Sequence, residues 1–240
     1  MDPEAVTART PRPLTRAMLA QSWRDAAFLH WEIDPEAVGP LLPPGVTVDL
    51  FGGVAHVGLI AFRMVRTRLF GSPPVPWLGT FCETNVRLYS VDAHGRRAVV
   101  FRWMAAERLL PALIGRAALG LPYRWSRMTL DRDGKRFTYT CATPASRVLV
   151  EAGAPIERPS PLELYLTSRW GLHTRAFGRT LHLANEHEPW PLHTAELLHC
   201  DDRLLAAAGI PGIVDRPPDS VLYSPGVHAR FGPARTPLHP

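Results

Sequence analysis

The segment FCETNVRLYSV, residues 81–91, places polar side chains at every second position of a predicted strand. Because side chains alternate across a strand, these four share one face: Glu83, Asn85, Arg87 and Tyr89. A solvated outer face would carry such a row too. Inside a barrel, the same row would form a polar pocket wall with an arginine for an anion, a glutamate for acid–base work and an amide for orientation.

The second chemical candidate is the stretch HEPWPLHTAE at residues 187–196. Its histidines do not have the helical spacing of a zinc site, and no pair lies two residues apart, as a strand would require. We therefore predict no metal here, while a site assembled from separate strands stays open. The two prolines fix an extended turn, so we expect Trp190 to anchor it in the core and His187 to lie at the end of a strand.

Nucleophile and cofactor patterns are missing from the sequence. The cysteines Cys82, Cys141 and Cys200 lie far apart and have no recognisable catalytic signature around them. The glycine-rich segment FGGVAHVG leads into another predicted strand rather than a helix, which argues against a dinucleotide fold. We expect no cofactor.

Composition limits the partners. With 46% hydrophobic and 20% charged residues, the 240-residue chain can build a full core. The formal charge is +5, but the arginines are scattered without a basic run, so we expect no nucleic-acid partner. The unpaired cysteines, the charged and proline-rich start and the lack of about 20 consecutive apolar residues predict a cytoplasmic protein without a membrane partner.

The predicted fold class is α+β. We expect a mostly antiparallel curved sheet that closes toward a barrel with an internal cavity, and few short helices. The expected units are a flexible tail with the start of a first helix (1–19), one β-rich domain (20–232) and a C-terminal tail (233–240). Within the domain we expect a hairpin around Gly52-Gly53, strands at 81–91, 97–106 and 123–130, a hairpin at 123–142, and helices at 107–120, 160–169 and 193–209.

Several segments occur in an order that resembles the YqjF-like proteins, a domain of unknown function in the acetoacetate decarboxylase-like superfamily. They are QSWRDAAFLHWEIDPEAVGPLLPPGVTVDLFGGVAHVGLIAFRM, FCETNVRLYSV, LPYRWSRM, LELYLTSRWGLHT, HEPWPLHTAE and YSPGV. The resemblance covers residues 20–230 and implies a curved antiparallel barrel with a cavity. It also implies an acidic pocket position at Glu83, with an anion contact from Arg63 and Arg87.

The sequence departs from the superfamily at its best-understood chemistry, which forms a Schiff base between a lysine and a β-keto acid. Lys135 is the only lysine, and it follows the turn DRDG at the tip of a predicted hairpin. We therefore expect no covalent lysine chemistry.

The resulting hypothesis is a small-molecule enzyme of lyase, isomerase or cyclase type. Glu83 and His187 would do acid–base work on a carbonyl or carboxylate substrate held by Arg87, with Asn85 and Tyr123 orienting it. A non-catalytic protein that binds an acidic metabolite in the same cavity is the alternative. An oligomerising structural protein is the third interpretation, and a homo-oligomer is compatible with each of them.

Overall fold

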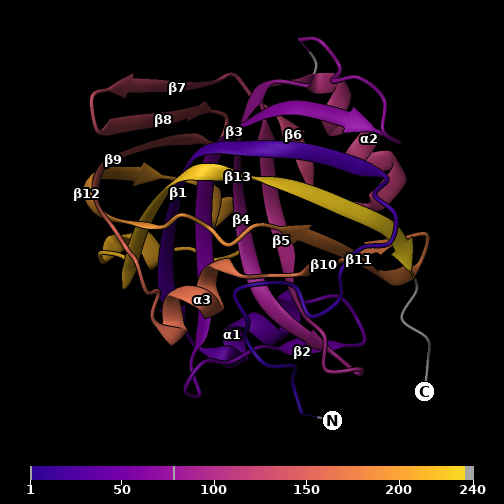
Figure 1. Ribbon diagram of the computed structural model, residues 1–240. Helices are drawn as coiled ribbons and strands as arrows, with labels where there is room; N and C mark the ends of the chain where they lie inside the picture. The colour runs from indigo at the N-terminus through magenta and orange to yellow at the C-terminus, as the bar shows by residue number, and fades with distance from the viewer. Residues whose placement is uncertain (1, 78, 236–240) are drawn as a thin grey trace.

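The computed structural model describes residues 2–77 and 79–235, and a closed barrel forms its centre (Figure 1). Successive neighbours around the barrel pair by hydrogen bonds, and the last strand pairs with the first. In spatial order the strands are β1 (Leu19–Ile33), β3 (Ala55–Leu69), β4 (Phe81–Asp92), β5 (Arg97–Ala106), β10 (Gly171–Ala176), β11 (Arg179–His187) and β13 (Ser220–Arg235). All pairs are antiparallel except β5 with β10.

The sheet continues beyond the barrel, because the first part of β13 also pairs with β12. Figure 1 shows this extension curling along one side of the barrel. It consists of β12 (His193–Asp202), β9 (Ala145–Pro155), β8 (Arg136–Ala142) and β7 (Met128–Asp133). Between the extension and the outer face of the barrel lies a hydrophobic core that includes Trp31, Leu59 and Phe137.

Short elements close the two ends of the barrel. The helix α2 (Leu109–Leu119) and β6 (Tyr123–Trp125) lie at one end, whereas α1 (Pro35–Val38) and β2 (Val46–Val48) lie at the other (Figure 1). The remaining short helices are η1 (Gly39–Leu41), α3 (Pro161–Thr167), α4 (Leu204–Ala207) and η2 (Ile213–Asp215). Ser160 and Glu163 form a capping box on α3, which fixes where this helix begins.

The barrel interior is set by side-chain alternation. Phe62 on β3 lies opposite Glu83 on β4, so both point inward, while Arg63 lies opposite Cys82 on the outer face. On β1 the alternation changes phase near Asp25, whose positive φ marks a bulge. Trp23 and Phe28 consequently both belong to the inner hydrophobic cluster. The curved antiparallel sheet closing into a barrel is thereby confirmed.

Three local predictions are wrong. No helix precedes β1, because residues from Leu19 onward already pair with β13 and β3. The segment 193–202 is a strand rather than a helix, because it pairs with β9 along most of its length. The strand after Gly52-Gly53 does not form a hairpin with β2, which pairs with β4 instead.

The two ends of the predicted domain differ in part from the expectation, and its boundaries stay a prediction. Residues 2–18 contain no helix and contact the barrel: Trp170 Nε1 donates to the Thr7 carbonyl oxygen at 3.2 Å, and Glu4 accepts from Arg97 N at 3.0 Å. At the other end, β13 continues past residue 232 to Arg235, and the rest of the predicted C-terminal tail lies outside the described residues.

Candidate active site

Glu83 forms the acidic part of the site, inside the barrel near the α2 end. Its side chain is buried, and each carboxylate oxygen accepts one hydrogen bond: Oε2 from the Tyr123 hydroxyl at 2.9 Å and Oε1 from Asn85 Nδ2 at 3.2 Å. Burial raises the pKa of Glu83 to about 7, against the opposing effect of these two hydrogen bonds. A carboxyl that titrates near neutral pH can both accept and donate a proton under physiological conditions.

The partners of Glu83 are held from two directions. Asn85 follows it on the same face of β4, and the Asn85 Oδ1 atom is buried without a hydrogen-bond partner in the described structure. Tyr123 comes from β6 and reaches Glu83 beneath α2. A Cβ at Gly115 of α2 would lie 2.8 Å from the Tyr123 ring, so the glycine allows this close approach. The unsatisfied amide oxygen is suited to orienting a polar ligand.

The raised pKa predicts a pH-dependent stability. Glu83 has an ordinary pKa of 4.5, so its favourable contribution is fully present below pH 4.5 and is lost as the pH rises through about 7. The loss amounts to about 3 kcal/mol. Glu83→Gln removes this titration. Between pH 4.5 and pH 8, we therefore expect the unfolding free energy of the wild type to fall by about 3 kcal/mol more than that of the variant, as measured by urea unfolding at both pH values. Parallel stability profiles of the two proteins would contradict the raised pKa.

Arg87 forms the cationic part of the site, on the same strand face as Glu83. Its Nη2 donates to the Leu166 carbonyl oxygen at 2.8 Å and its Nε to the Tyr89 hydroxyl at 3.2 Å. The guanidinium carbon lies 5.6 Å from the centre of the Phe28 ring. No carboxylate of residues 2–77 and 79–235 forms an ion pair with Arg87.

Arg87 is partly exposed, unlike its neighbours on β4. The neighbouring Val86 and Leu88 point to the outer core and are fully buried, whereas Arg87 remains partly accessible on the inner face. Arg87 is therefore less buried than its neighbours on β4. An arginine without a counter-ion in such a place is suited to binding a carboxylate. The internal cavity as such stays a prediction.

Tyr89 and His30 hold the Arg87 side chain in position through hydrogen bonds. The Tyr89 hydroxyl donates to the Leu166 carbonyl oxygen at 2.9 Å and lies 2.8 Å from His30 Nε2. Since the hydroxyl has one proton, His30 Nε2 must be the donor in the second contact. Burial lowers the pKa of His30 well below its ordinary value, so this imidazole is neutral. The pair holds Arg87 without adding charge.

His187 lies at the end of β11, as predicted, in an aromatic surrounding. Its ring centre is 4.6 Å from that of Trp170 and 5.2 Å from that of Trp190. His187 Nδ1 lies 2.6 Å from the Glu188 carbonyl oxygen, which only accepts, so Nδ1 carries the proton and Nε2 has the lone pair. Burial lowers the pKa of His187 to about 4. The neutral ring is thus a hydrogen-bond acceptor and a weak base.

Trp190 anchors the turn after β11, as expected. It stacks on Trp23 with ring centres 5.7 Å apart and meets the Phe28 ring edge-on at 5.0 Å. Its Nε1 donates to the Thr167 carbonyl oxygen at 3.1 Å. Because Phe28 also contacts Arg87, the aromatic cluster connects His187 with Arg87 across the barrel.

Two expectations about charged side chains had opposite outcomes. Arg63 is exposed on the outer face of β3, where its Nη2 donates to the Leu130 carbonyl oxygen at 3.4 Å. The prediction that it contacts the same anion as Arg87 is therefore wrong, because the two side chains lie on opposite faces of the sheet. Lys135 is exposed beside Gly134 at the turn between β7 and β8, as predicted, and cannot act inside the barrel.

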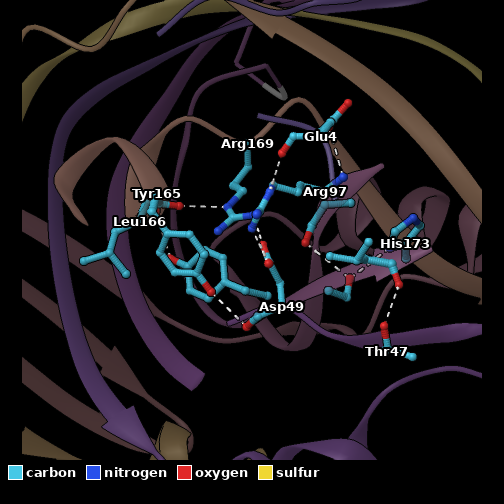
Figure 2. Close-up of polar contacts among 12 residues, drawn as sticks. Glu4, Thr47, Asp49, Arg97, Tyr165, Leu166, Arg169 and His173 are labelled. Atoms are coloured by element: carbon cyan, nitrogen blue, oxygen red, sulfur yellow. Dashed lines mark hydrogen bonds and ion pairs between the residues drawn. The ribbon is translucent and has the colours of Figure 1, made fainter. Parts of the chain in front are cut away.

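A buried ion cluster near the β2 end was not predicted (Figure 2). Asp49 pairs with Arg97 through one oxygen and with Arg169 through the other, the latter at 2.5 Å. Tyr165 contributes its hydroxyl, which donates to the Asp49 carbonyl oxygen at 2.9 Å. The Arg169 guanidinium carbon lies 4.6 Å from the centre of the Tyr89 ring. The cluster therefore packs directly against a residue that holds Arg87.

The sequence contained a weak signal for this cluster. Asp49 and Arg169 are single charged residues within the apolar segments GVTVDLF and LYLTSRWGL. A charge in a buried element requires a partner. Nothing local identifies that partner, because the two residues lie 120 positions apart.

In residues 2–77 and 79–235 we find no group of three or more histidine, cysteine, aspartate and glutamate side chains placed to hold a metal ion. Within the same residues, none of the helices has the length and hydropathy needed to cross a lipid bilayer.

Comparisons with known proteins agree with the fold. The chain is 27% identical to the uncharacterized protein YqjF of Bacillus subtilis (strain 168) over 186 residues, which cover 75% of this chain and 76% of that protein. The enduracididine biosynthesis enzyme MppR complexed with pyruvate superposes with a TM-score of 0.65 at 16% identity, covering 94% of this chain and 92% of that one. Acetoacetate decarboxylase from Legionella pneumophila gives a TM-score of 0.62 at 16% identity, with the same two coverages.

The superpositions show a shared acetoacetate decarboxylase-like fold. At identities this low, the likeness concerns the fold and not the chemistry. The family model DUF2071, described as an uncharacterized conserved protein, matches residues 20–228 and therefore nearly all of the barrel and its extension. This chain is a YqjF-like member of the DUF2071 family with an acetoacetate decarboxylase-like fold.

Proposed function

We propose that this protein is an enzyme that acts by acid–base chemistry on a small carboxylate metabolite, without a covalent lysine intermediate. The observation that carries the proposal is the inner face of β4. It combines a buried carboxyl with a pKa of about 7 and an arginine that has no ion-pair partner among the described residues. Enzymes produce such raised pKa values where a proton must be transferred near neutral pH.

Proton transfer, orientation and anion binding fall to different side chains of the site. Glu83 would transfer the proton, with Tyr123 and Asn85 fixing its orientation. Arg87 would bind the substrate carboxylate, and it lies four residues further along the strand, roughly 13 Å away between Cα atoms. These roles retain the predicted assignments on β4 and β6.

His187 fits a different role from the one predicted. A pKa of about 4 makes it a poor proton acceptor at pH 7, but its Nε2 lone pair can accept a hydrogen bond from a substrate hydroxyl or amine. We therefore assign proton transfer to Glu83, ligand orientation to His187, and part of the apolar wall to Trp190.

The site and the fold neighbours both favour a small keto acid as the substrate. The names of two neighbours refer to pyruvate and to acetoacetate, which are small keto acids. A keto acid has a carboxylate that Arg87 would bind and an acidic C–H beside a carbonyl that Glu83 would deprotonate.

A panel of keto acids and hydroxy acids in D₂O provides the test. We expect the protein to catalyse exchange or conversion of at least one compound, seen as loss of a C–H signal in proton NMR. A compound that binds and emerges unchanged, without exchange, would instead favour the alternative of a binding protein. The enzyme proposal fails if no compound is altered.

Arg87→Gln is expected to weaken carboxylate binding by about tenfold to a hundredfold, because it removes a charge-assisted hydrogen bond. Isothermal titration with the compound found in the panel measures the effect. Arg63→Gln is the matched control, since this arginine lies on the outer face of the adjacent strand. Equal affinities of the Arg87 and Arg63 variants would exclude Arg87 as the anion contact.

A further inference from the structure

A second concentration of positive charge lies on the outer face of the barrel, away from the candidate active site. A hollow of about 330 Å³ opens there between the strands β1, β3 and β13 and the segment that leads into β1. The residues of this hollow that matter here are Thr15, Arg16, Ala20, Arg68, His228 and Arg230. We call it the arginine hollow. Its volume is at the lower end of the range of small-molecule pockets.

The strand register explains why the hollow exists. Ala20 on β1 lies directly between Arg68 on β3 and Arg230 on β13, its cross-strand partners on either side. The small alanine leaves the space that the two long side chains flank. Neighbouring strands are about 4.8 Å apart, so the two arginine Cα atoms are separated by about 10 Å. Two guanidinium groups at this separation can converge on one anion.

A histidine lies beside the two arginines and senses their charge. His228 follows one step along the same face of β13, and its Nδ1 lies 3.1 Å from the Ser22 hydroxyl oxygen. Desolvation and the nearby Arg68, Arg230, Arg66 and Arg24 lower the pKa of this imidazole. Four arginines therefore act on one exposed histidine.

Negative charge at the hollow is limited. Glu186 pairs with Arg230 at 2.8 Å, and its other oxygen already accepts from the Leu14 backbone N–H at 2.7 Å. No carboxylate of the described residues forms an ion pair with Arg16 or Arg68. The Arg68 Nε atom is buried and has no hydrogen-bond partner in the described structure. A buried, unpaired guanidinium N–H is costly unless a ligand accepts from it.

From this geometry we propose that the arginine hollow is a binding site for a phosphate group, contacted by Arg68 and Arg230 from opposite sides of Ala20. Guanidinium groups match phosphate oxygens with paired hydrogen bonds, and a doubly charged phosphate uses two arginines better than a single carboxylate does. The volume leaves space for an organic group attached to the phosphate. The site is independent of the proposed activity.

The phosphate has two plausible chemical sources, a soluble phosphomonoester or an anionic lipid headgroup. Leu69 and Phe70 directly follow Arg68 and are exposed, at 44% and 65%. Exposed apolar side chains beside arginines are compatible with a lipid surface as well as with a soluble ligand. The test therefore has one arm for each source.

The first arm measures binding of inorganic phosphate and of glycerol phosphate by calorimetry and by NMR of the His228 ring, at constant ionic strength set with chloride. We expect saturable binding that shifts the His228 signals. Arg68→Gln combined with Arg230→Gln should weaken it by at least about tenfold. The control Arg147→Gln, at an exposed position on β9, should bind as the wild type does.

A second variant tests the geometry without removing an arginine. Ala20→Glu places a carboxylate between Arg68 and Arg230, and we expect it to abolish phosphate binding while keeping the fold. The proposal is overturned if the wild type binds neither these ligands nor vesicles that contain phosphatidic acid, or if both variants bind phosphate as the wild type does. It is also overturned if chloride at equal ionic strength produces the same shift.

The second arm compares sedimentation with vesicles of phosphatidylcholine alone and with added phosphatidic acid. Co-sedimentation that requires phosphatidic acid and is lost in the double arginine variant identifies a lipid headgroup as the source. Binding of glycerol phosphate without co-sedimentation identifies a soluble phosphomonoester. Either outcome supports the phosphate site, because both depend on Arg68 and Arg230.

Discussion

Glu83→Gln is expected to lower turnover of the substrate found in the panel by about 10²–10⁴-fold, the usual contribution of a positioned acid–base group. Glutamine keeps the size of the side chain and can still contact Tyr123 and Asn85, but it cannot transfer a proton. Binding through Arg87 should persist, so we expect the decrease mainly in kcat. Steady-state kinetics at pH 7, together with calorimetric binding of the same compound, separates the two effects.

The matched control for this prediction is Glu151→Gln. Glu151 is a glutamate on β9 whose side chain is 39% exposed and pairs with Arg136 on the surface. We expect its replacement to leave kcat unchanged. Comparable turnover by the Glu83 and Glu151 variants would show that Glu83 does not transfer the proton.

Asp49→Ala is expected to destabilise the fold by about 3–5 kcal/mol. The substitution leaves the guanidinium groups of Arg97 and Arg169 without their shared carboxylate, and the Arg169 side chain is only 3% exposed. An uncompensated charge in the interior is far more costly than a broken surface pair. Urea unfolding at constant pH measures the loss of free energy.

Glu151→Ala again serves for comparison, because it breaks the exposed pair with Arg136. A surface pair contributes at most about 1 kcal/mol. We therefore expect the Asp49 variant to lose several times more stability than the Glu151 variant. Similar losses for the two would mean that the buried cluster does not hold the β2 end of the barrel together.

The predicted elements succeeded where local pattern and pairing agree. Alternation identified the inner face of β4, and the partner segment 97–106 was predicted with the bounds of β5. The segment HTAELLHC was mistaken for a helix because its apolar residues have no clean period of two. Its conformation is set by pairing with β9, whose residues lie 38 to 52 positions earlier in the chain. Tertiary pairing of this kind overrides local preference.

The candidate site shows the same limit. Glu83, Asn85 and Arg87 were found because one strand contains them all, and Tyr123 because it lies in a short aromatic segment. Arg63 was misplaced since alternation alone does not say which face of β3 points inward. Only the register of Phe62 with Glu83 decides it. The Asp49–Arg169 pair depends on a contact between distant segments, which no local pattern encodes.

The pKa of the Glu83 carboxyl is the quantity on which the proposed function depends most directly. Carbon-13 NMR of protein labelled at the glutamate side-chain carboxyl, titrated from pH 4 to pH 9, measures it, and the spectrum of Glu83→Gln assigns the signal. We predict a midpoint of about 7, caused by burial inside the barrel. A midpoint near the ordinary value of 4.5 would contradict the account, because Glu83 would then be permanently ionised at neutral pH.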